Sequence, residues 1–168
     1  LRKYQEHLED LVLERTAELE KMNYLLQREV GERRRAEEVL ERSEKYYRSL
    51  VEKSFDFVSV FDAEADFIYV SPSVERVLGY SAEEMMKKKG FDLIHPEDVE
   101  GIMDAYSDSL LDEGGFRLVR CRVKHKDGSW RYCEAIATNL IADPAVAGVV
   151  VNVRDITDRK QTEEELEM

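Results

Sequence analysis

Long apolar runs, abundant cysteine and an excess of positive charge are all missing from this sequence. The longest apolar run, residues 145–151, is interrupted by Gly148 and is far shorter than the roughly 18 residues of a membrane span. No secretory signal pattern is present, and two cysteines are too few for a disulfide framework, which favours a reducing compartment. The net charge of −12 disfavours nucleic acid and anionic membrane surfaces as direct partners.

Catalytic and metal-binding patterns are missing as well. The sequence contains no Gly-rich phosphate loop and no Ser/His/Asp or Cys/His arrangement that would activate a nucleophile. Cys121 and Cys133 lack the third and fourth ligands of a zinc site, and a strained cross-strand disulfide does not suit a reducing compartment. We expect two small buried residues there and no enzymatic activity in this segment, although its parent protein can have a catalytic part after Met168.

Residues 1–50 have the pattern of a coiled coil. Between Leu8 and Leu50 the chain has no Pro and a single Gly, and apolar residues recur with a seven-residue rhythm that polar residues around Gly31 interrupt. A lone amphipathic helix packed on its own domain is the alternative. A helix on the order of 60 Å long outreaches a domain of about a hundred residues, so we expect a parallel homodimer. Its predicted seam consists of Leu8, Val12, Leu19, Met22, Leu26, Leu40, Tyr47 and Leu50.

From Phe55 onward the pattern changes to that of a mixed α and β domain. Residues 55–62 and 67–70 predict two strands joined by a turn. Strand patterns resume at Phe116, and residues 148–154 predict the last strand. Between them, three helix starts are marked by capping residues: Ser71 with Pro72, Ser81 with Glu84, and His95 with Pro96.

The hairpin after Phe116 has a register that its side chains predict. A three-residue loop at 126–128, with Gly128 in the left-handed conformation, places Cys121 opposite Cys133 and Arg120 opposite Glu134. A two-residue loop would mix polar and apolar side chains on both faces. The inner face of the hairpin then has unusually small residues, which favours a cavity beside it rather than a fully packed core.

Four motifs, together with this order of elements, resemble a PAS domain of the S-box type over residues 46–160. The motifs are SPSVERVLGY at 71–80, HPED at 95–98, KDGSW at 126–130 and DIT at 155–157. The resemblance implies an α+β fold, with a five-stranded antiparallel sheet and short helices on one face. It divides the chain into a coiled-coil signalling helix at 1–50, a PAS domain at 51–157 and the start of an output helix at 158–168.

In that family the core binds a small ligand or cofactor, or only dimerises. Light-sensing relatives form a flavin adduct on a Cys after the second strand, but residues 55–120 contain no Cys. Haem-binding relatives place a His within the third helix, whereas His95 stands before Pro96, a position suited to capping. The cofactor is therefore left unassigned. The candidate ligand-binding residues are Ser71, Arg117, Val119, Cys121, Cys133, Ala135 and Val151, with Arg117 either facing an anionic ligand or solvated.

The resemblance also implies a role for the end of the domain. Asp155, Ile156 and Thr157 are expected to transmit a change in the sheet to the output helix, with Thr157 capping that helix. We expect a cytoplasmic sensory module of a histidine kinase in a two-component system, either free or membrane-anchored, with a small-molecule ligand and an effector domain in the same chain. A ligand-free dimerisation and relay domain, or the input domain of a diguanylate cyclase, is the alternative.

Overall fold

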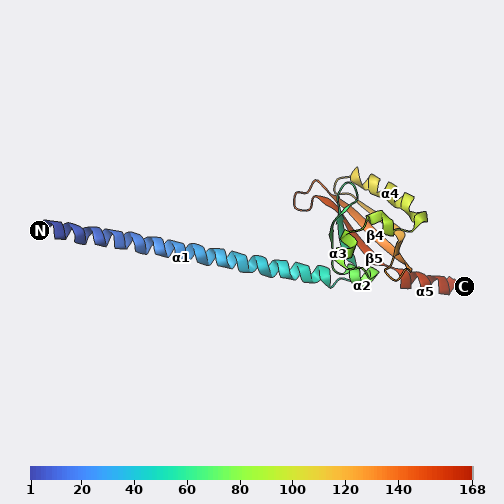
Figure 1. Cartoon of the computed structure of the whole chain (residues 1–168), viewed down its shortest axis with the longest axis horizontal. Helices are drawn as coiled ribbons and strands as arrows, with labels where there is room; N and C mark the ends of the chain where they lie inside the picture. Colours follow the sequence, from blue (N-terminus) through green and yellow to red (C-terminus); the bar gives the residue numbers. More distant parts are fainter. Residues whose placement is uncertain (168) are drawn as a thin grey trace. The chain divides into compact units, whose positions relative to one another are not determined.

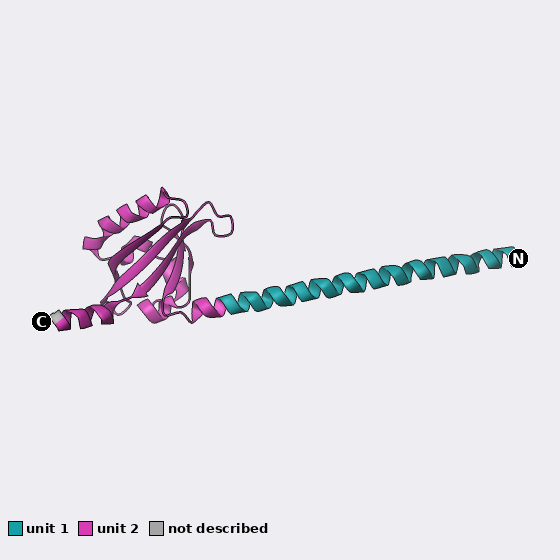
Figure 2. Ribbon diagram, turned by 180° about the vertical axis from the view of Figure 1, so that it is seen from behind, with its two compact units in different colours: residues 1–47 teal, residues 48–168 magenta. Residues whose placement is uncertain are grey.

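The computed structural model describes residues 1–167 and separates the chain into two compact units, residues 1–47 and 48–168 (Figure 2). Helix α1 (Arg2–Glu52) is continuous and has no buried residue. Its polar interruption at Gly31 does not break the helix, in keeping with the cost of only about 1 kcal/mol for a helical glycine. Among the described residues, no helix combines the length and the apolar character that crossing a bilayer requires.

The second unit is built on an antiparallel sheet of five strands in the order β2-β1-β5-β4-β3. The predicted α+β fold with a five-stranded antiparallel sheet is confirmed. The last strand of the sequence lies at the centre, between the first strand and the long hairpin. The strands are β1 (Phe57–Phe61), β2 (Phe67–Val70), β3 (Phe116–Lys124), β4 (Trp130–Leu140) and β5 (Gly148–Asp155).

The β3–β4 hairpin has the predicted register. Cys121 pairs with Cys133 and Arg120 with Glu134, and the Arg120 guanidinium lies 2.8 Å from the Glu134 carboxylate. Gly128 has a φ of 90° in the loop, which explains why glycine occupies this position. The small side chains therefore share one face of the sheet, and that face meets the helices.

Four short helical segments follow β2 and lie on one side of the sheet (Figure 1). They are α2 (Val74–Leu78), α3 (Ala82–Met86), the 3₁₀ turn η1 (Gly90–Leu93) and α4 (Pro96–Leu110). The capping box of Ser81 and Glu84 is present, and His95 caps α4 through its imidazole. The prediction that Ser71 caps the first of these helices was wrong: α2 begins after Ser73, because the Ser71 hydroxyl accepts a hydrogen bond from the Val58 N–H instead.

Helix α4 is fixed to the sheet at both ends. At its start, the Asp98 carboxylate accepts hydrogen bonds from the Arg122 guanidinium at 2.7 Å and from the Arg122 backbone N–H at 2.8 Å. At its end, the Asn139 side-chain amide donates to the Ser109 carbonyl at 3.0 Å and to the Leu110 carbonyl at 3.3 Å. The helix therefore spans the face of β3 and β4 as a cover with two tethers.

Candidate functional site

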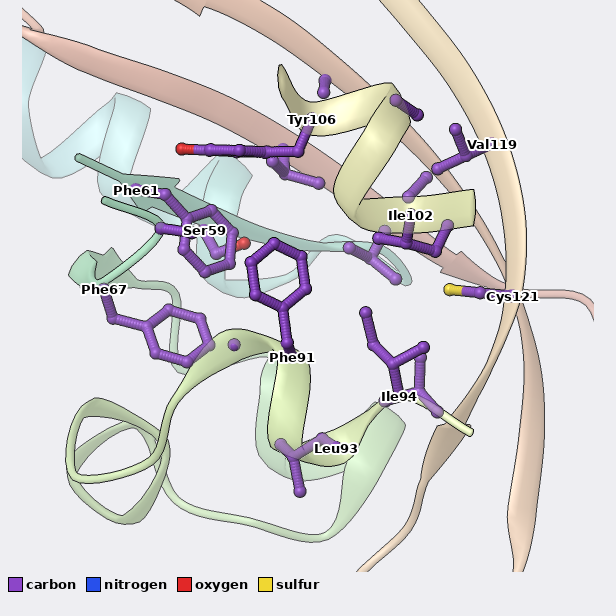
Figure 3. A pocket seen from close by; sticks show the side chains of 18 of the residues that line it. Ser59, Phe61, Phe67, Phe91, Leu93, Ile94, Ile102, Tyr106, Val119 and Cys121 are labelled. Atoms are coloured by element: carbon purple, nitrogen blue, oxygen red, sulfur yellow. The ribbon is translucent and has the colours of Figure 1, made fainter. Parts of the chain in front are cut away.

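A cavity of about 120 Å³ lies between the sheet and its covering helices. Since a water needs roughly 10–15 Å³ of such space, the cavity is large enough for a small organic molecule. Strands β1, β3, β4 and β5 supply the wall on the sheet side, and α4 and η1 supply the opposite wall. Figure 3 shows the side chains from both walls converging on this space.

Aromatic rings form one end of the cavity. The Phe61 ring lies 4.5 Å from the Phe67 ring and 6.2 Å from the Tyr106 ring, and the Phe91 ring lies 6.0 Å from that of Tyr106. The last two contacts are edge-to-face, the geometry that aromatic quadrupoles favour. The Tyr106 hydroxyl donates a hydrogen bond to the Asp62 carbonyl, and burial raises the pKa of this phenol. Tyr106 therefore stays neutral, and its hydrogen bond holds α4 against the residue that follows β1.

The other end of the cavity is lined by small and aliphatic side chains. Val119 and Cys121 of β3 face it together with Ala135 of β4 and Val151 of β5. In Figure 3 the Cys121 sulfur points into the space. Burial raises the pKa of this thiol to about 11, so it is protonated at neutral pH and behaves as a small apolar group.

Five of the candidate ligand-binding residues line the cavity, and two do not. Arg117, Val119, Cys121, Ala135 and Val151 are brought together around it.

Ser71 and Cys133 lie elsewhere in the domain. Ser71 is fully buried, and its hydroxyl contacts the Ser73 hydroxyl at 2.8 Å, so it joins α2 to the edge of β1. Cys133 is 1% exposed and belongs to the hydrophobic core. In the register Cys133 pairs with Cys121 of β3 and neighbours Asp155 at the end of β5, but it is not among the residues that line the cavity.

Arg117 is at the edge of the cavity and has its own partners. Its guanidinium donates to the Phe116 carbonyl at 3.0 Å and lies 3.4 Å from the Asp112 carboxylate, and its side chain is 42% exposed. Among the described residues that line the cavity, Arg117 alone carries a charge at neutral pH. The interior is consequently an apolar space with a single cation at its solvent side.

Several lining residues were missed at the level of sequence. Ile102, Ala105 and Tyr106 share one face of α4, and their spacing of three and four residues was the available signal. Ser59 was missed because a serine within a strand gives no indication of which face it occupies until the neighbouring strands are known.

The end of β5 is joined to helix α5 (Thr157–Glu167) by three interlocking residues. The Asp155 carboxylate accepts hydrogen bonds from both the N–H and the hydroxyl of Thr157. The Ile156 N–H donates to the Tyr132 carbonyl at 2.8 Å. Thr157, expected to cap the helix, is its first residue; Asp155 accepts its N–H, and its hydroxyl accepts a hydrogen bond from the Tyr132 N–H of β4.

Among the side chains that the structure describes, no group of three or more His, Cys, Asp or Glu residues could hold a metal ion.

An antiparallel sheet in the order β2-β1-β5-β4-β3, covered by short helices over an apolar cavity, defines the PAS fold. In agreement, residues 67–148 match a family model described as the PAS fold. The domain in the second unit therefore has the PAS fold.

Known proteins of several kinds contain similar domains. The White collar 2 protein of Neurospora crassa is 34% identical over 93 residues, which are 55% of this chain and 17% of that protein. The PAS domain of an HTR-like protein from Haloarcula marismortui has a TM-score of 0.62 at 23% identity, over 73% of this chain and 99% of the other. A domain of a sensory box sensor histidine kinase/response regulator from Geobacter sulfurreducens has a TM-score of 0.55 at 21% identity, over 69% of this chain and 96% of the other.

Proposed function

We propose that this chain is the input module of a signalling protein, in which a small molecule bound in the cavity alters the position of α5. The cavity is the observation that favours sensing over a ligand-free relay, because a pure relay domain would have a filled core. An unfilled apolar space of about 120 Å³ costs stability unless something occupies it.

A short mechanical path connects the cavity with α5. Ala135 and Val153, which line the cavity, are a directly paired couple in the β4–β5 ladder. The ladder ends two residues further along at Cys133 and Asp155, and the Asp155 carboxylate accepts the N–H of Thr157, the first residue of α5. A ligand that pushes β4 away from α4 therefore shifts the end of the β4–β5 ladder, to which the first residues of α5 are bound.

We further propose that the parent protein is a sensor histidine kinase acting in the cytoplasm and that the chain dimerises through α1. Sensory box histidine kinases from Geobacter sulfurreducens and Burkholderia thailandensis contain domains of this fold, which supports the first point. The exposed apolar seam supports the second, since Leu19 is 65% exposed and Leu26 is 55% exposed in the single chain. Under this proposal, residues 1–50 form the signalling helix, residues 51–157 the PAS domain and residues 158–168 the start of the output helix.

Native mass spectrometry of the protein as purified tests the sensing function. We expect a bound small molecule, and we expect its removal to change amide hydrogen exchange in residues 155–160. The control region is residues 126–129 of the hairpin loop, which lie outside the path. A protein that has no bound mass and is stabilised by no compound in a diverse library would instead be a relay module.

A further inference from the structure

We propose that the cavity is selective for a small, uncharged, single-ring aromatic molecule with one hydrogen-bonding group placed against the Ser59 hydroxyl. This rests on the proposed sensing function and adds the chemical class of what is sensed. The physical basis is the unpaired hydroxyl of Ser59, the set of aromatic rings beside it and the lack of a buried charge among the described residues that line the cavity.

Ser59 differs from the other buried serines of the domain. Ser71 and Ser73 are 0% exposed, and Ser59 and Ser109 are 1% exposed. The three others each have a hydrogen-bond partner: the Val58 N–H at 2.8 Å, the Asp56 carbonyl at 3.0 Å and the Tyr106 carbonyl at 2.6 Å, respectively.

The Ser59 hydroxyl makes no hydrogen bond within the described residues, and Ser59 is the member of this group that lines the cavity. Its oxygen is not sealed in the core, since the fully buried side-chain polar atom without a partner in the described part of the chain is Arg131 Nε; the Ser59 oxygen faces the cavity instead. Buried hydroxyls are normally satisfied, because leaving one unpaired sacrifices the hydrogen bond that it makes with water in the unfolded chain. A ligand atom in the cavity is the partner that the fold leaves room for.

The other polar groups at the cavity are already engaged or electrically neutral. Tyr106 uses its hydroxyl on the Asp62 carbonyl, and the buried thiol of Cys121 is a weak donor. Ser59 therefore provides the one strong hydrogen-bonding group available to a ligand inside the described lining.

Charge is disfavoured within the cavity. A buried carboxylate or ammonium needs a compensating ion, and Arg117 stands at the solvent side, where Asp112 already pairs with it. An ionised ligand would lose its hydration without gaining a buried partner, so the site favours neutral molecules.

The shape of the interior indicates a ring. Phe61 and Ser59 belong to the same strand two residues apart, and Figure 3 shows the Ser59 hydroxyl among the rings of Phe61, Phe91 and Tyr106. A planar ring can pack against these faces and edges while its substituent reaches the hydroxyl. The volume of about 120 Å³, against roughly 10–15 Å³ for one water, leaves room for one ring together with its substituent.

Isothermal titration calorimetry of the full chain at pH 7 with phenol, toluene and benzoate tests this selectivity. These probes share the ring and differ in having a neutral hydrogen-bonding group, none, or a charge. We expect phenol to bind more tightly than toluene by about tenfold, as one satisfied hydrogen bond allows, and benzoate to bind more weakly than both. Benzoate binding as tightly as phenol would overturn the proposed ligand class.

Substitution of Ser59 locates the effect. Ser59→Ala should reduce phenol affinity about tenfold to the level of toluene and leave toluene within about twofold. Ser71→Ala, which removes an equally buried hydroxyl outside the cavity, should leave the phenol-to-toluene ratio unchanged. An unaltered ratio in S59A would overturn the role of Ser59, and the ranking of the three probes on the wild-type chain requires no variant.

Failure of this ligand class is distinguishable from failure of the sensing function. If none of the three probes binds, the ligand class is overturned. The sensing function is overturned as well only if the purified protein has no bound mass and responds to no other compound.

Discussion

The hydroxyl of Thr157 accepts a hydrogen bond from the backbone N–H of Tyr132 at 3.0 Å, and the Tyr132 carbonyl accepts one from Ile156 at 2.8 Å. The paired part of β5 ends at Asp155, so these two bonds continue the connection to β4 beyond the strand. The first residues of α5 are thereby bound to the strand that lines the cavity.

Replacing Thr157 with Val should loosen this connection. The Tyr132 N–H then loses its acceptor, and leaving it unpaired should lower the free energy of unfolding by about 1 kcal/mol. Amide exchange of residues 156–160 should accelerate more than that of β1. Thr157→Ser keeps the hydroxyl and should resemble the wild type in both measurements, whereas equal behaviour of the Val and Ser variants would contradict the role of the hydroxyl.

The Asp98–Arg122 pair predicts a specific loss of stability in acid. Its hydrogen bonds from Arg122 hold the pKa of Asp98 at about 2, below the ordinary 3.8. Because the native state keeps this carboxylate ionised more firmly than the unfolded chain does, the pair stabilises the fold above about pH 4 and loses that contribution as the pH falls toward 2. Asp98→Asn should therefore be less stable than the wild type at pH 7, and urea denaturation should show the difference shrinking between pH 4 and pH 2.

Glu97 is the matched control for this prediction. It also pairs with Arg122, at 2.8 Å, but its side chain is 74% exposed, so its ion pair is largely screened by solvent. Glu97→Gln should change the unfolding free energy much less than Asp98→Asn at pH 7. An Asp98→Asn variant that remains equally destabilised down to pH 2 would exclude the Arg122 pair as the cause.

Gly148 is a position where even a methyl group should be costly. A Cβ there would lie 2.6 Å from a Val60 methyl group and 2.8 Å from the Phe61 carbonyl oxygen, so β1 and β5 would have to separate. Gly148→Ala should lower the free energy of unfolding by about 1–3 kcal/mol, measured by chemical denaturation.

Gly101 supplies the opposite expectation from the same substitution. It lies in α4, and a Cβ there would meet no atom within 4 Å. Gly101→Ala should raise the free energy of unfolding by about 0.5–1 kcal/mol through better helix propensity. Similar effects of the two substitutions would argue against the close contact of β1 and β5 at Gly148.

The proposed dimer through α1 can be tested by placing charge in its seam. The double substitution Leu19→Lys and Leu26→Lys puts like charges opposite each other in a parallel pair, and we expect the mass in solution to fall from that of a dimer to that of a monomer. Sedimentation equilibrium measures this directly.

The control places the same charges outside the seam. Leu13 and Tyr24 are 69% and 66% exposed and lie off the seven-residue rhythm that contains Leu19. Leu13→Lys with Tyr24→Lys should retain the dimer mass. Dimers in both double variants, or monomers in both, would contradict the assigned seam.

The hairpin shows how far the sequence alone could predict the fold. Pairing Cys121 with Cys133 and Arg120 with Glu134 separated small from charged residues, and only one loop length allowed it, so the whole register of β3 and β4 followed. Local rules were sufficient because each side-chain choice on these strands depends on its cross-strand neighbour. The capping box at Ser81 and Glu84 was predictable for the same local reason.

The helical side of the cavity was not predictable in this way. Tyr106 approaches Phe61 and Phe91 because three separate elements meet, and no local pattern indicates such a meeting. Ser71 illustrates the opposite error: its position before Pro72 suited a helix cap, but tertiary structure offered its hydroxyl the Val58 N–H. Competition between a local and a distant partner is settled only once the chain is folded.

The two tethers of α4 have a consequence for timing. Hydrogen bonds hold α4 at both ends: Arg122 of β3 binds Asp98 at its start, and Asn139 of β4 binds the Ser109 carbonyl at its end. Neither end of α4 can therefore move away from the sheet while both sets of bonds remain. Displacement of α4 away from the sheet thus requires a local opening that breaks one of these tethers. Weakening either tether, at Asp98 or at Asn139, should therefore make one wall of the cavity more mobile and speed the exchange of a bound molecule.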